Sequence, residues 1–564
     1  MKLMNQLDGH PLAMRAILPR LENMSAGKVL VALRFNLESL NQGLEPELAK
    51  LYATLAFVEQ SLPENLRPLL ALIAMHEGFV TAGLVEAMAS RVQPGWSRTK
   101  IDHVIQTLAL AGLLRDDGYT SHEMHPLLTS YLRSTQAIKI RPEDRDHWAR
   151  AFVGVMGTLA NEVAQGRAHQ QRGPLRVHAQ NFYQALAEAK RLGMSISTSM
   201  LTQALAVFAF NSGNFDVARR LYEQYVVLMK SQGELEGEAV AYNQLGRLAQ
   251  QQRDFVSAEQ WYRKSLAIEE QLGNERGLAA TYHGMAGLAE AQRDFVSAKT
   301  WYQKSLGISE RLGIEDYAAT TYGELGRIAE QERDIVSAEQ WYRKSLVLQE
   351  KLGNEQSAAN TYHRLGMLAG EQRDFAAARN WYGKSLVLRE RLGDEREAAQ
   401  TYYQLGGIAQ WEEDFDAAEG WYRKSLDITE RLGVADDAAC TYEALGAIAQ
   451  YHGDFAAAGQ WYRKSLAVKE NIGDEHSLAI TYALIGILAG VQGNFLACGQ
   501  WQIVALAGFI RAQDRQRSLG TMREFMSSYQ KASSSDQQTL RATWQEAGLG
   551  EFPEGMIQPR QSEA

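Results

Sequence analysis

Apolar and polar positions recur with a period of forty residues over most of residues 198–514. Each period carries two apolar stripes at helical spacing, separated by a short polar stretch such as Arg253-Asp254. Self-similarity at a fixed period of this length is typical of a solenoid. The pattern therefore predicts a helix, a turn and a return helix in every period. In the copy that begins near 238 the stripes are Tyr242, Leu245, Leu248 and Ala249, then Phe255, Ala258, Trp261, Tyr262, Ser265, Leu266 and Ile268.

An aromatic pair marks the second stripe in every regular copy. A stripe that repeats without change predicts core between successive repeats. In the first stripe, Gly246 recurs in the later copies except where Ala286 replaces it. A position limited to a methyl group or less predicts close approach of two helices. The pair stands at Trp261-Tyr262, Trp301-Tyr302, Trp341-Tyr342, Trp381-Tyr382, Trp421-Tyr422 and Trp461-Tyr462, with decayed forms at Leu221-Tyr222 and Trp501-Gln502.

The repeat resembles the tetratricopeptide repeat (TPR) in its longer form of about forty residues. Arg253 stands where that family usually has glycine, Ser265 stands where it has alanine, and no proline closes the unit. The resemblance implies an all-α fold, an α-solenoid of eight helix-turn-helix units that begin near 198, 238, 278, 318, 358, 398, 438 and 478. The family positions are filled by Leu245-Gly246, Phe255, Ala258, Tyr262 and Leu266.

The same resemblance implies a concave surface lined by the first helix of each unit. Residues at the implied surface positions differ from copy to copy while the core positions hold steady. Such variation is expected of a surface that recognises an irregular partner, and neutral drift at solvated positions would look the same. Aromatic residues and arginine dominate binding hot spots, so we expect a protein or peptide ligand here. The candidate partner-binding residues are Asn243, Arg247, His283, Arg327, His363, Tyr403, Trp411 and Tyr451.

Residues 46–135 form a second pattern, four helical segments followed by a hairpin with its turn at Asp117-Gly118. This order resembles the winged helix of STAND signalling ATPases, the class that includes the NB-ARC proteins. Gly9-His10-Pro11-Leu12-Ala13 and Met124-His125-Pro126 resemble two motifs of that family. The resemblance implies that Pro11 lies against adenine and that His125 reaches the phosphates of ADP. An ordinary helix start and a locally packed junction histidine are the alternatives.

The nucleotide-binding core of that family has no counterpart in the sequence. A P-loop needs a glycine five residues ahead of its Gly-Lys pair, but Gly27-Lys28 has Glu22 there and Gly383-Lys384 has Ala378. We therefore expect no ATPase activity and no cofactor, with ADP or ATP only where a separate nucleotide-binding domain is supplied. No constellation of catalytic residues is visible, so the chain is predicted not to be an enzyme. His122, Glu123 and His125 match no zinc spacing, and no metal site is predicted.

The composition of the chain limits the classes of partner that it is expected to bind. The net charge of −9 argues against general nucleic-acid binding. No apolar run approaches the length of a membrane span, and the N-terminus lacks a signal peptide, so we expect a cytoplasmic protein with no membrane partner. The two cysteines, Cys440 and Cys498, fall in repeat helices at positions of small residues, which predicts two buried free thiols.

The expected organisation has six parts. They are a helical segment with the Gly-x-Pro motif (1–45), a winged-helix-like domain (46–135), a helical linker or cap (136–197), the solenoid (198–514), capping helices (515–550) and a disordered tail (551–564). We expect a non-enzymatic TPR scaffold or sensor that binds a protein or peptide and is the C-terminal part of a STAND-type signalling protein without its P-loop ATPase core. A separately encoded STAND ATPase is a further candidate partner. The alternatives are a sensor fragment of a longer STAND ATPase and a winged-helix transcription regulator.

Overall fold

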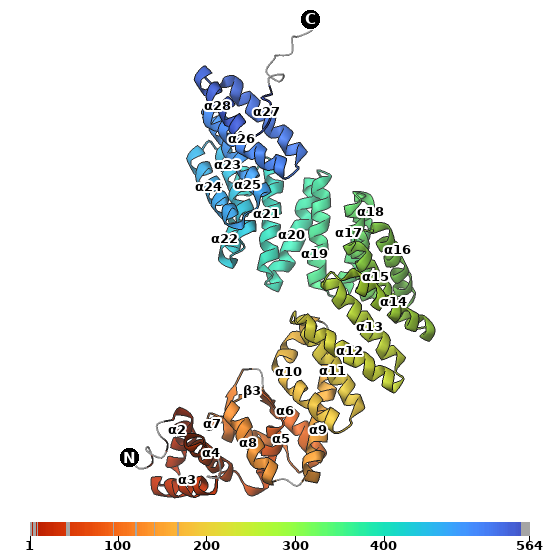
Figure 1. Ribbon diagram of the computed structural model, residues 1–564, viewed down its shortest axis with the longest axis vertical. Helices are drawn as coiled ribbons and strands as arrows, with labels where there is room; N and C mark the ends of the chain where they lie inside the picture. Colours follow the sequence, from red (N-terminus) through yellow and green to blue (C-terminus); the bar gives the residue numbers. More distant parts are fainter. Residues whose placement is uncertain are drawn as a thin grey trace. The chain divides into compact units, whose positions relative to one another are not determined.

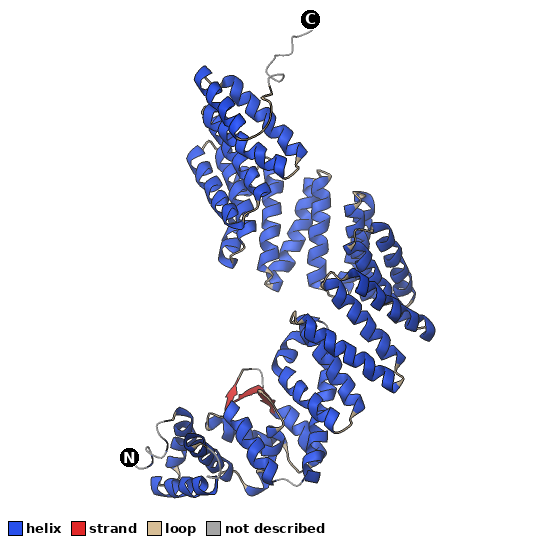
Figure 2. Cartoon of the chain, in the orientation of Figure 1, coloured by secondary structure: helices blue, strands red, loops and turns tan. Residues whose placement is uncertain are grey.

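Antiparallel helix pairs make up most of the chain (Figures 1 and 2). The computed structural model describes residues 3, 7, 10–40, 45–93, 95–118, 121–139, 142–165 and 168–553. These residues divide into two compact units, 1–305 and 306–564. Among the described residues, no helix combines the length and apolar character that crossing a bilayer requires.

The N-terminal part of the first unit joins short helices to a small antiparallel sheet. Strand β3 (Ser121–Met124) lies between β1 (Phe79–Thr81) and β2 (Leu114–Asp116). The predicted hairpin is confirmed, because Asp116 pairs with His122 across the turn. The helices are α2 (Pro11–Ile17), η1 (Leu18–Glu22), α3 (Ala26–Leu40), α4 (Pro46–Gln60), η2 (Glu64–Leu66), α5 (Leu69–Ala74), α6 (Ala82–Val92), α7 (Arg98–Leu110), α8 (Pro126–Lys139), α9 (Pro142–Gln165) and α10 (Ala168–Arg191).

Three details of this part differ from the sequence prediction. The sequence predicts a turn over 76–79 that leads to a helix from about Thr81, whereas β1 occupies Phe79–Thr81, and its three residues are too few to show an alternating pattern. The second of the four predicted helical segments, residues 62–74, is split into η2 and α5 around Pro68, because proline lacks the amide hydrogen that a continuing helix needs. Within the region predicted as a helical linker or cap, the polar residues 165–174 predict a loop between two helices, and this is wrong from residue 168 onward, since α10 begins at Ala168 and contains Pro174.

Paired helices of nearly constant length follow, two in each repeat. Every helix after the first of these begins 20 residues after the one before it. The helices are α11 (Ser195–Asn211), α12 (Phe215–Gln232), α13 (Leu235–Gln251), α14 (Phe255–Leu272), α15 (Glu275–Ala291), α16 (Phe295–Arg311), α17 (Glu315–Gln331), α18 (Ile335–Lys351), α19 (Glu355–Glu371), α20 (Phe375–Leu392), α21 (Glu395–Trp411), α22 (Phe415–Leu432), α23 (Ala435–Tyr451), α24 (Phe455–Ile472), α25 (Glu475–Val491) and α26 (Phe495–Arg511).

The two helices of a repeat meet at the predicted glycine. A Cβ atom built on Gly246 would lie 2.7 Å from the ring of Tyr262, so the expected close approach is confirmed. The fully buried Ser265 hydroxyl donates to the carbonyl of Ala239 at 2.9 Å, and Ser345 and Ser385 repeat this bond. Serine therefore replaces the alanine of the family pattern because its hydroxyl joins the second helix of a repeat to the first.

The repeated tryptophans join one repeat to the next, as predicted. Trp381 packs against the buried cluster that α17, α18 and α19 build. Within its own repeat, Trp261 stacks on Tyr242, with the two ring centroids 5.4 Å apart. The ammonium of Lys264 lies 4.2 Å from the Trp261 ring centroid, an arrangement that recurs along the array.

The turn between the paired helices has an unusual backbone. Arg253, Arg293, Arg333 and Arg373 all adopt positive φ, between 59° and 62°, where glycine is the residue of least strain. The aspartate that follows then caps the second helix, since Asp254 Oδ1 accepts from the Ser257 amide at 3.1 Å. Arginine therefore stands, in four successive repeats, at a turn position whose backbone conformation is strained for any residue other than glycine.

Two helices close the C-terminal end, α27 (Arg515–Lys531) and α28 (Ser534–Glu546). They bury Phe525 and Trp544 against Ile503 and Leu506 of α26. Phe552, expected in a disordered tail, packs on this cluster, with its ring 5.6 Å from that of Trp544. The rest of the expected tail, 554–564, lies outside the described residues.

One cysteine differs from expectation. Cys498 is buried as predicted, whereas Cys440 is exposed. Residue 440 occupies the helix position of Asn360 and Gln400, which are also exposed. The expectation that Cys440 is buried is therefore wrong. The polar residues Asn360 and Gln400 at the equivalent positions indicate exposure to solvent better than the small size of the cysteine side chain indicates burial.

Candidate functional site

The eight candidate residues of the repeats lie in three different environments. Four of them, at one equivalent position, are half-buried between helices and contact their neighbours. Asn243 donates to the Thr281 hydroxyl at 3.2 Å. His283 meets the ring of Tyr302 edge-on at 5.1 Å, and the ring of Tyr403 lies 5.4 Å from that of Tyr422.

The fourth, His363, shows what this environment does to a titratable group. Its Nδ1 lies 3.3 Å from the Thr401 hydroxyl, and its ring meets Tyr382 edge-on at 5.2 Å. Burial, together with the charges of Arg389 and Arg364, lowers the pKa of His363 to about 3. Burial also raises the pKa of Tyr403 to about 12. Both side chains are therefore neutral at physiological pH.

Close to His363 lies Arg389, whose charge lowers the pKa of that histidine and which belongs to a second variable position not singled out from the sequence. It is buried in every central repeat yet always polar. Lys469, for example, pairs with Glu443 at 2.5 Å, and Arg389 donates to Thr401 at 2.6 Å. A polar residue that varies at a fixed place on the apolar stripe could have indicated this layer. Its members are Glu269, Ser309, Gln349, Arg389, Thr429 and Lys469.

The two candidate arginines lie nearer to solvent. Arg247 is exposed, and its guanidinium lies 5.5 Å from the Phe210 ring centroid. Arg327 pairs with Glu324 of its own helix at 2.6 Å. Both side chains are therefore held by contacts within the array while part of each guanidinium faces water.

Trp411 and Tyr451 form the third environment, at the last residues of α21 and α23. They are 67% and 63% exposed. Trp411 stacks on Phe375 with centroids 6.2 Å apart and planes inclined by 14°, and Tyr451 stacks on Phe415 at 3.5 Å. Because Tyr403 precedes Trp411 by eight residues, the two lie roughly 12 Å apart along the helix axis. The exposed aromatic pair is thus beside the turns, away from the half-buried set.

The N-terminal motif residues have local partners. Pro11 is the first residue of α2, and Gly9 of its motif lies outside the described residues. His125 joins β3 to α8, where its Nδ1 accepts from the Leu127 amide at 3.3 Å and its own amide donates to the Leu113 carbonyl at 3.0 Å. Arg98, at the start of α7, pairs with Asp102 at 2.9 Å and with Glu86 at 3.6 Å.

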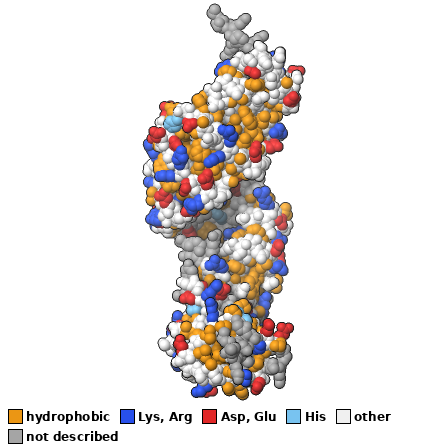
Figure 3. All heavy atoms as spheres, turned by 90° about the vertical axis from the view of Figure 1, so that its left-hand side faces the viewer, with side chains coloured by type: hydrophobic (Ala, Val, Ile, Leu, Met, Phe, Trp, Pro, Cys, Tyr) orange, Lys and Arg blue, Asp and Glu red, His pale blue; other side chains and the backbone are white. Residues whose placement is uncertain are grey.

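Charge on the surface is mixed. On the face drawn in Figure 3, basic and acidic side chains alternate with apolar ones. Within the described part of the chain, no group of three or more His, Cys, Asp or Glu side chains is placed to hold a metal ion. The chemistry on offer at the described surface is therefore recognition through aromatic and charged side chains.

Comparison with protein families identifies the repeated unit. Residues 196–271, 277–351, 317–391, 357–431 and 397–471 match the model described as tetratricopeptide repeat. A search of curated proteins finds no match.

Several solved structures are similar. BtubC (BKLC) from P. vanneervenii is 24% identical, with 39% of this chain and 90% of that chain covered and a TM-score of 0.36. A STAND protein with a tetratricopeptide repeat sensor from Pyrococcus horikoshii is 14% identical, with 83% and 74% covered and a TM-score of 0.47. The apo quorum sensor NprR from B. thuringiensis is 13% identical, with 60% and 99% covered and a TM-score of 0.38.

Proposed function

We propose that this chain, which carries tetratricopeptide repeats, is a non-enzymatic scaffold or sensor that binds a peptide or a segment of another protein. The observation that carries the proposal is the pair Trp411 and Tyr451, two large aromatic side chains about two-thirds exposed at the same position of neighbouring repeats. Large aromatic residues contribute most to binding when a partner covers them. Their exposure in the free chain leaves that contribution available.

The packing around this pair supports recognition. Phe375 and Phe415 stack on the two rings and restrict their rotamers before any partner arrives. A side chain that is already ordered loses less conformational entropy on binding.

The experiment is a selection from a random peptide library on the immobilised full chain, followed by affinity measurement of the selected peptides. We expect the Trp411→Ala, Tyr451→Ala double variant to lose at least about tenfold in affinity, the loss typical of a hot spot. The change is mild for the fold, because Ala291 occupies the equivalent position of another repeat.

A matched control removes exposed apolar side chains elsewhere on the array. Val336 and Val347 are 64% and 63% exposed, and their double replacement by alanine should leave the affinity of selected peptides unchanged. Equal binding by the aromatic variant and the parent would contradict the assignment of Trp411 and Tyr451.

A second candidate concerns the N-terminal part. Helices α5 to α8 with the sheet β1-β3-β2 support a winged-helix-like module, and we propose that it docks to a separately supplied STAND nucleotide-binding chain. Pro11 and His125 would then contact adenine and phosphate of ADP held by that partner. Calorimetric titration of ADP onto the partner, with and without this chain, tests the idea, and His125→Ala should remove any gain in ADP affinity.

The transcription-regulator alternative has less support. Ion pairs to Asp102 and Glu86 neutralise Arg98, the first residue of the helix that would read DNA. A DNA-binding assay over a salt series would detect such a role, because phosphate contacts make binding steeply dependent on salt.

A further inference from the structure

The exposed aromatic pair lies beside a turn that carries several carboxylates, one of which, Glu412, pairs with Arg379 at 3.2 Å. We call Trp411, Glu412, Glu413, Asp416 and Tyr451 the turn-edge site. It comprises the turn between α21 and α22 and the last residue of α23, all within the second unit. Asp416 is an open acidic group, with a side chain 95% exposed and its carboxylate 3.9 Å from His452 Nε2.

The charge of this turn is reversed relative to the turns before it. Four successive repeats place arginine at the positive-φ position, the last of them Arg373, whereas Glu413 occupies it here with a φ of 60°. At the position of Asp416, earlier repeats carry the apolar residues Val256, Val296 and Val336. The repeat that presents Trp411 is thus also the one in which the turn becomes acidic.

A cation already contacts the site. The Arg373 guanidinium lies 5.6 Å from the Trp411 ring centroid. The negative face of an indole ring attracts a guanidinium or ammonium at this distance. The ring therefore accepts a cation in the free chain, supplied there by the chain itself.

We propose that the turn-edge site docks a lysine- or arginine-bearing segment of the partner protein. This inference rests on the proposed function and names the class of partner. The aromatic faces receive the cationic side chains and their aliphatic stems, while Glu413 and Asp416 supply opposite charge. Nucleic acid does not fit the same surface, because its phosphates would meet these carboxylates. Arg373 is the internal cation that the partner's side chain displaces from Trp411.

The test uses two fluorescein-labelled decapeptides, one of alternating arginine and glycine and one of alternating glutamate and glycine. Binding to the full chain is followed by anisotropy at low and at high salt. We expect the arginine peptide to bind more tightly than the glutamate peptide, with an affinity that falls as salt rises.

Three variants define the site. Glu413→Gln with Asp416→Asn should weaken the arginine peptide about fivefold, as expected for two exposed charges. Gln513 occupies the positive-φ position of a later turn, so the fold accepts glutamine at this position.

Arg373→Gly should tighten binding, because it removes the competing cation, and Gly453 and Gly493 stand at the equivalent place. The control Asp216→Asn, at the equivalent place of a turn without an exposed aromatic residue, should leave affinity unchanged.

The outcomes separate this inference from the proposed function. Equal or tighter binding of the glutamate peptide, or weaker binding by Arg373→Gly, would overturn the cationic partner. Selected library peptides that depend on Trp411 and Tyr451 but carry net negative charge would also overturn it, while the proposed function stands. If no selected peptide depends on the aromatic pair, the proposed function fails and this inference fails with it.

Discussion

At the scale of single residues, burial determines how the variable side chains behave. His363 lies between helices beside Thr401, with Arg389 and Arg364 close enough to oppose its protonation. Its pKa of about 3 in the folded chain is far below the ordinary value of about 6.5. The residue is therefore a neutral part of the packing, and the variation at its position reflects the neighbours that each copy must fit.

The lowered pKa of His363 predicts acid sensitivity. Between pH 6.5 and 3 the unfolded chain binds a proton at this histidine that the folded chain excludes, so stability falls as pH is lowered through that window. His363→Asn, which places the residue of position 243 here, should reduce the loss of unfolding free energy between pH 7 and 5 by up to about 2 kcal/mol. Denaturant unfolding of parent and variant at both pH values measures this. An identical loss in the two proteins would contradict it.

At the scale of elements, the glycine contact sets the spacing of each helix pair. A Cβ atom on Gly366 would lie 2.8 Å from the Tyr382 ring, so any side chain must displace that ring. Alanine also gains about 1 kcal/mol of helix propensity over glycine, which offsets part of the displacement. This balance explains why alanine stands at the equivalent place in two copies, as Ala206 and Ala286, and no larger residue stands there in the others.

The same balance predicts a steep dependence on side-chain size. Gly366→Ala should change the free energy of unfolding by less than about 1 kcal/mol, whereas Gly366→Val should lower it by about 2 kcal/mol, because overpacking against the Tyr382 ring outweighs the small gain in helix propensity over glycine. Denaturant unfolding checks both values. Gly383→Ala and Gly383→Val serve as controls, since a Cβ atom there meets nothing within 4 Å. Similar costs at the two glycines would show that the ring contact is not the cause.

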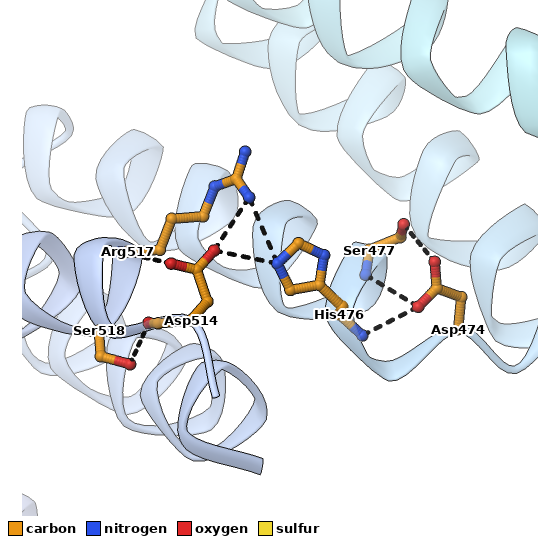
Figure 4. Close-up of polar contacts among 6 residues, drawn as sticks. All are labelled: Asp474, His476, Ser477, Asp514, Arg517 and Ser518. Atoms are coloured by element: carbon orange, nitrogen blue, oxygen red, sulfur yellow. Dashed lines mark hydrogen bonds and ion pairs between the residues drawn. The ribbon is translucent and has the colours of Figure 1, made fainter. Parts of the chain in front are cut away.

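Polar contacts also join elements of successive repeats, as the C-terminal end shows (Figure 4). Asp514 caps α27 by accepting from the Arg517 amide at 2.9 Å. Its other carboxylate oxygen lies 3.1 Å from His476 Nε2, near the start of α25. These hydrogen bonds and the Arg517 guanidinium lower the pKa of Asp514 to about 2. One carboxylate thus both begins a helix and ties it to the preceding repeat.

At the scale of the whole molecule, stacking between neighbours predicts that damage stays local. Trp544 is fully buried, with its ring 5.1 Å from that of Phe525 in the cluster that closes the C-terminal end. Trp544→Ala should destabilise this end by about 4 kcal/mol. Because each repeat of a solenoid contacts only its neighbours, we expect faster hydrogen exchange in α26 to α28 and unchanged exchange in the first unit.

Hydrogen exchange read by mass spectrometry checks this prediction. Trp411→Ala is the matched control, because the same substitution at an exposed residue should change exchange little anywhere outside α20 to α22. A loss of protection across both units in the Trp544 variant would show that the chain unfolds as one cooperative body instead.

The sequence by itself determined the helical repeats, because a forty-residue period with two apolar stripes leaves few other ways to bury Tyr262 and Trp261. It also indicated the close approach at Gly246, since only a very small side chain recurs there. The sequence did not predict strand β1, because three residues are too few to show an alternating pattern. Only the tertiary structure separated the half-buried Tyr403 from the exposed Trp411. Both are aromatic residues of one helix. Tyr403 packs against Tyr422 of α22, whereas Trp411, the last residue of α21, stacks on Phe375 and is still 67% exposed.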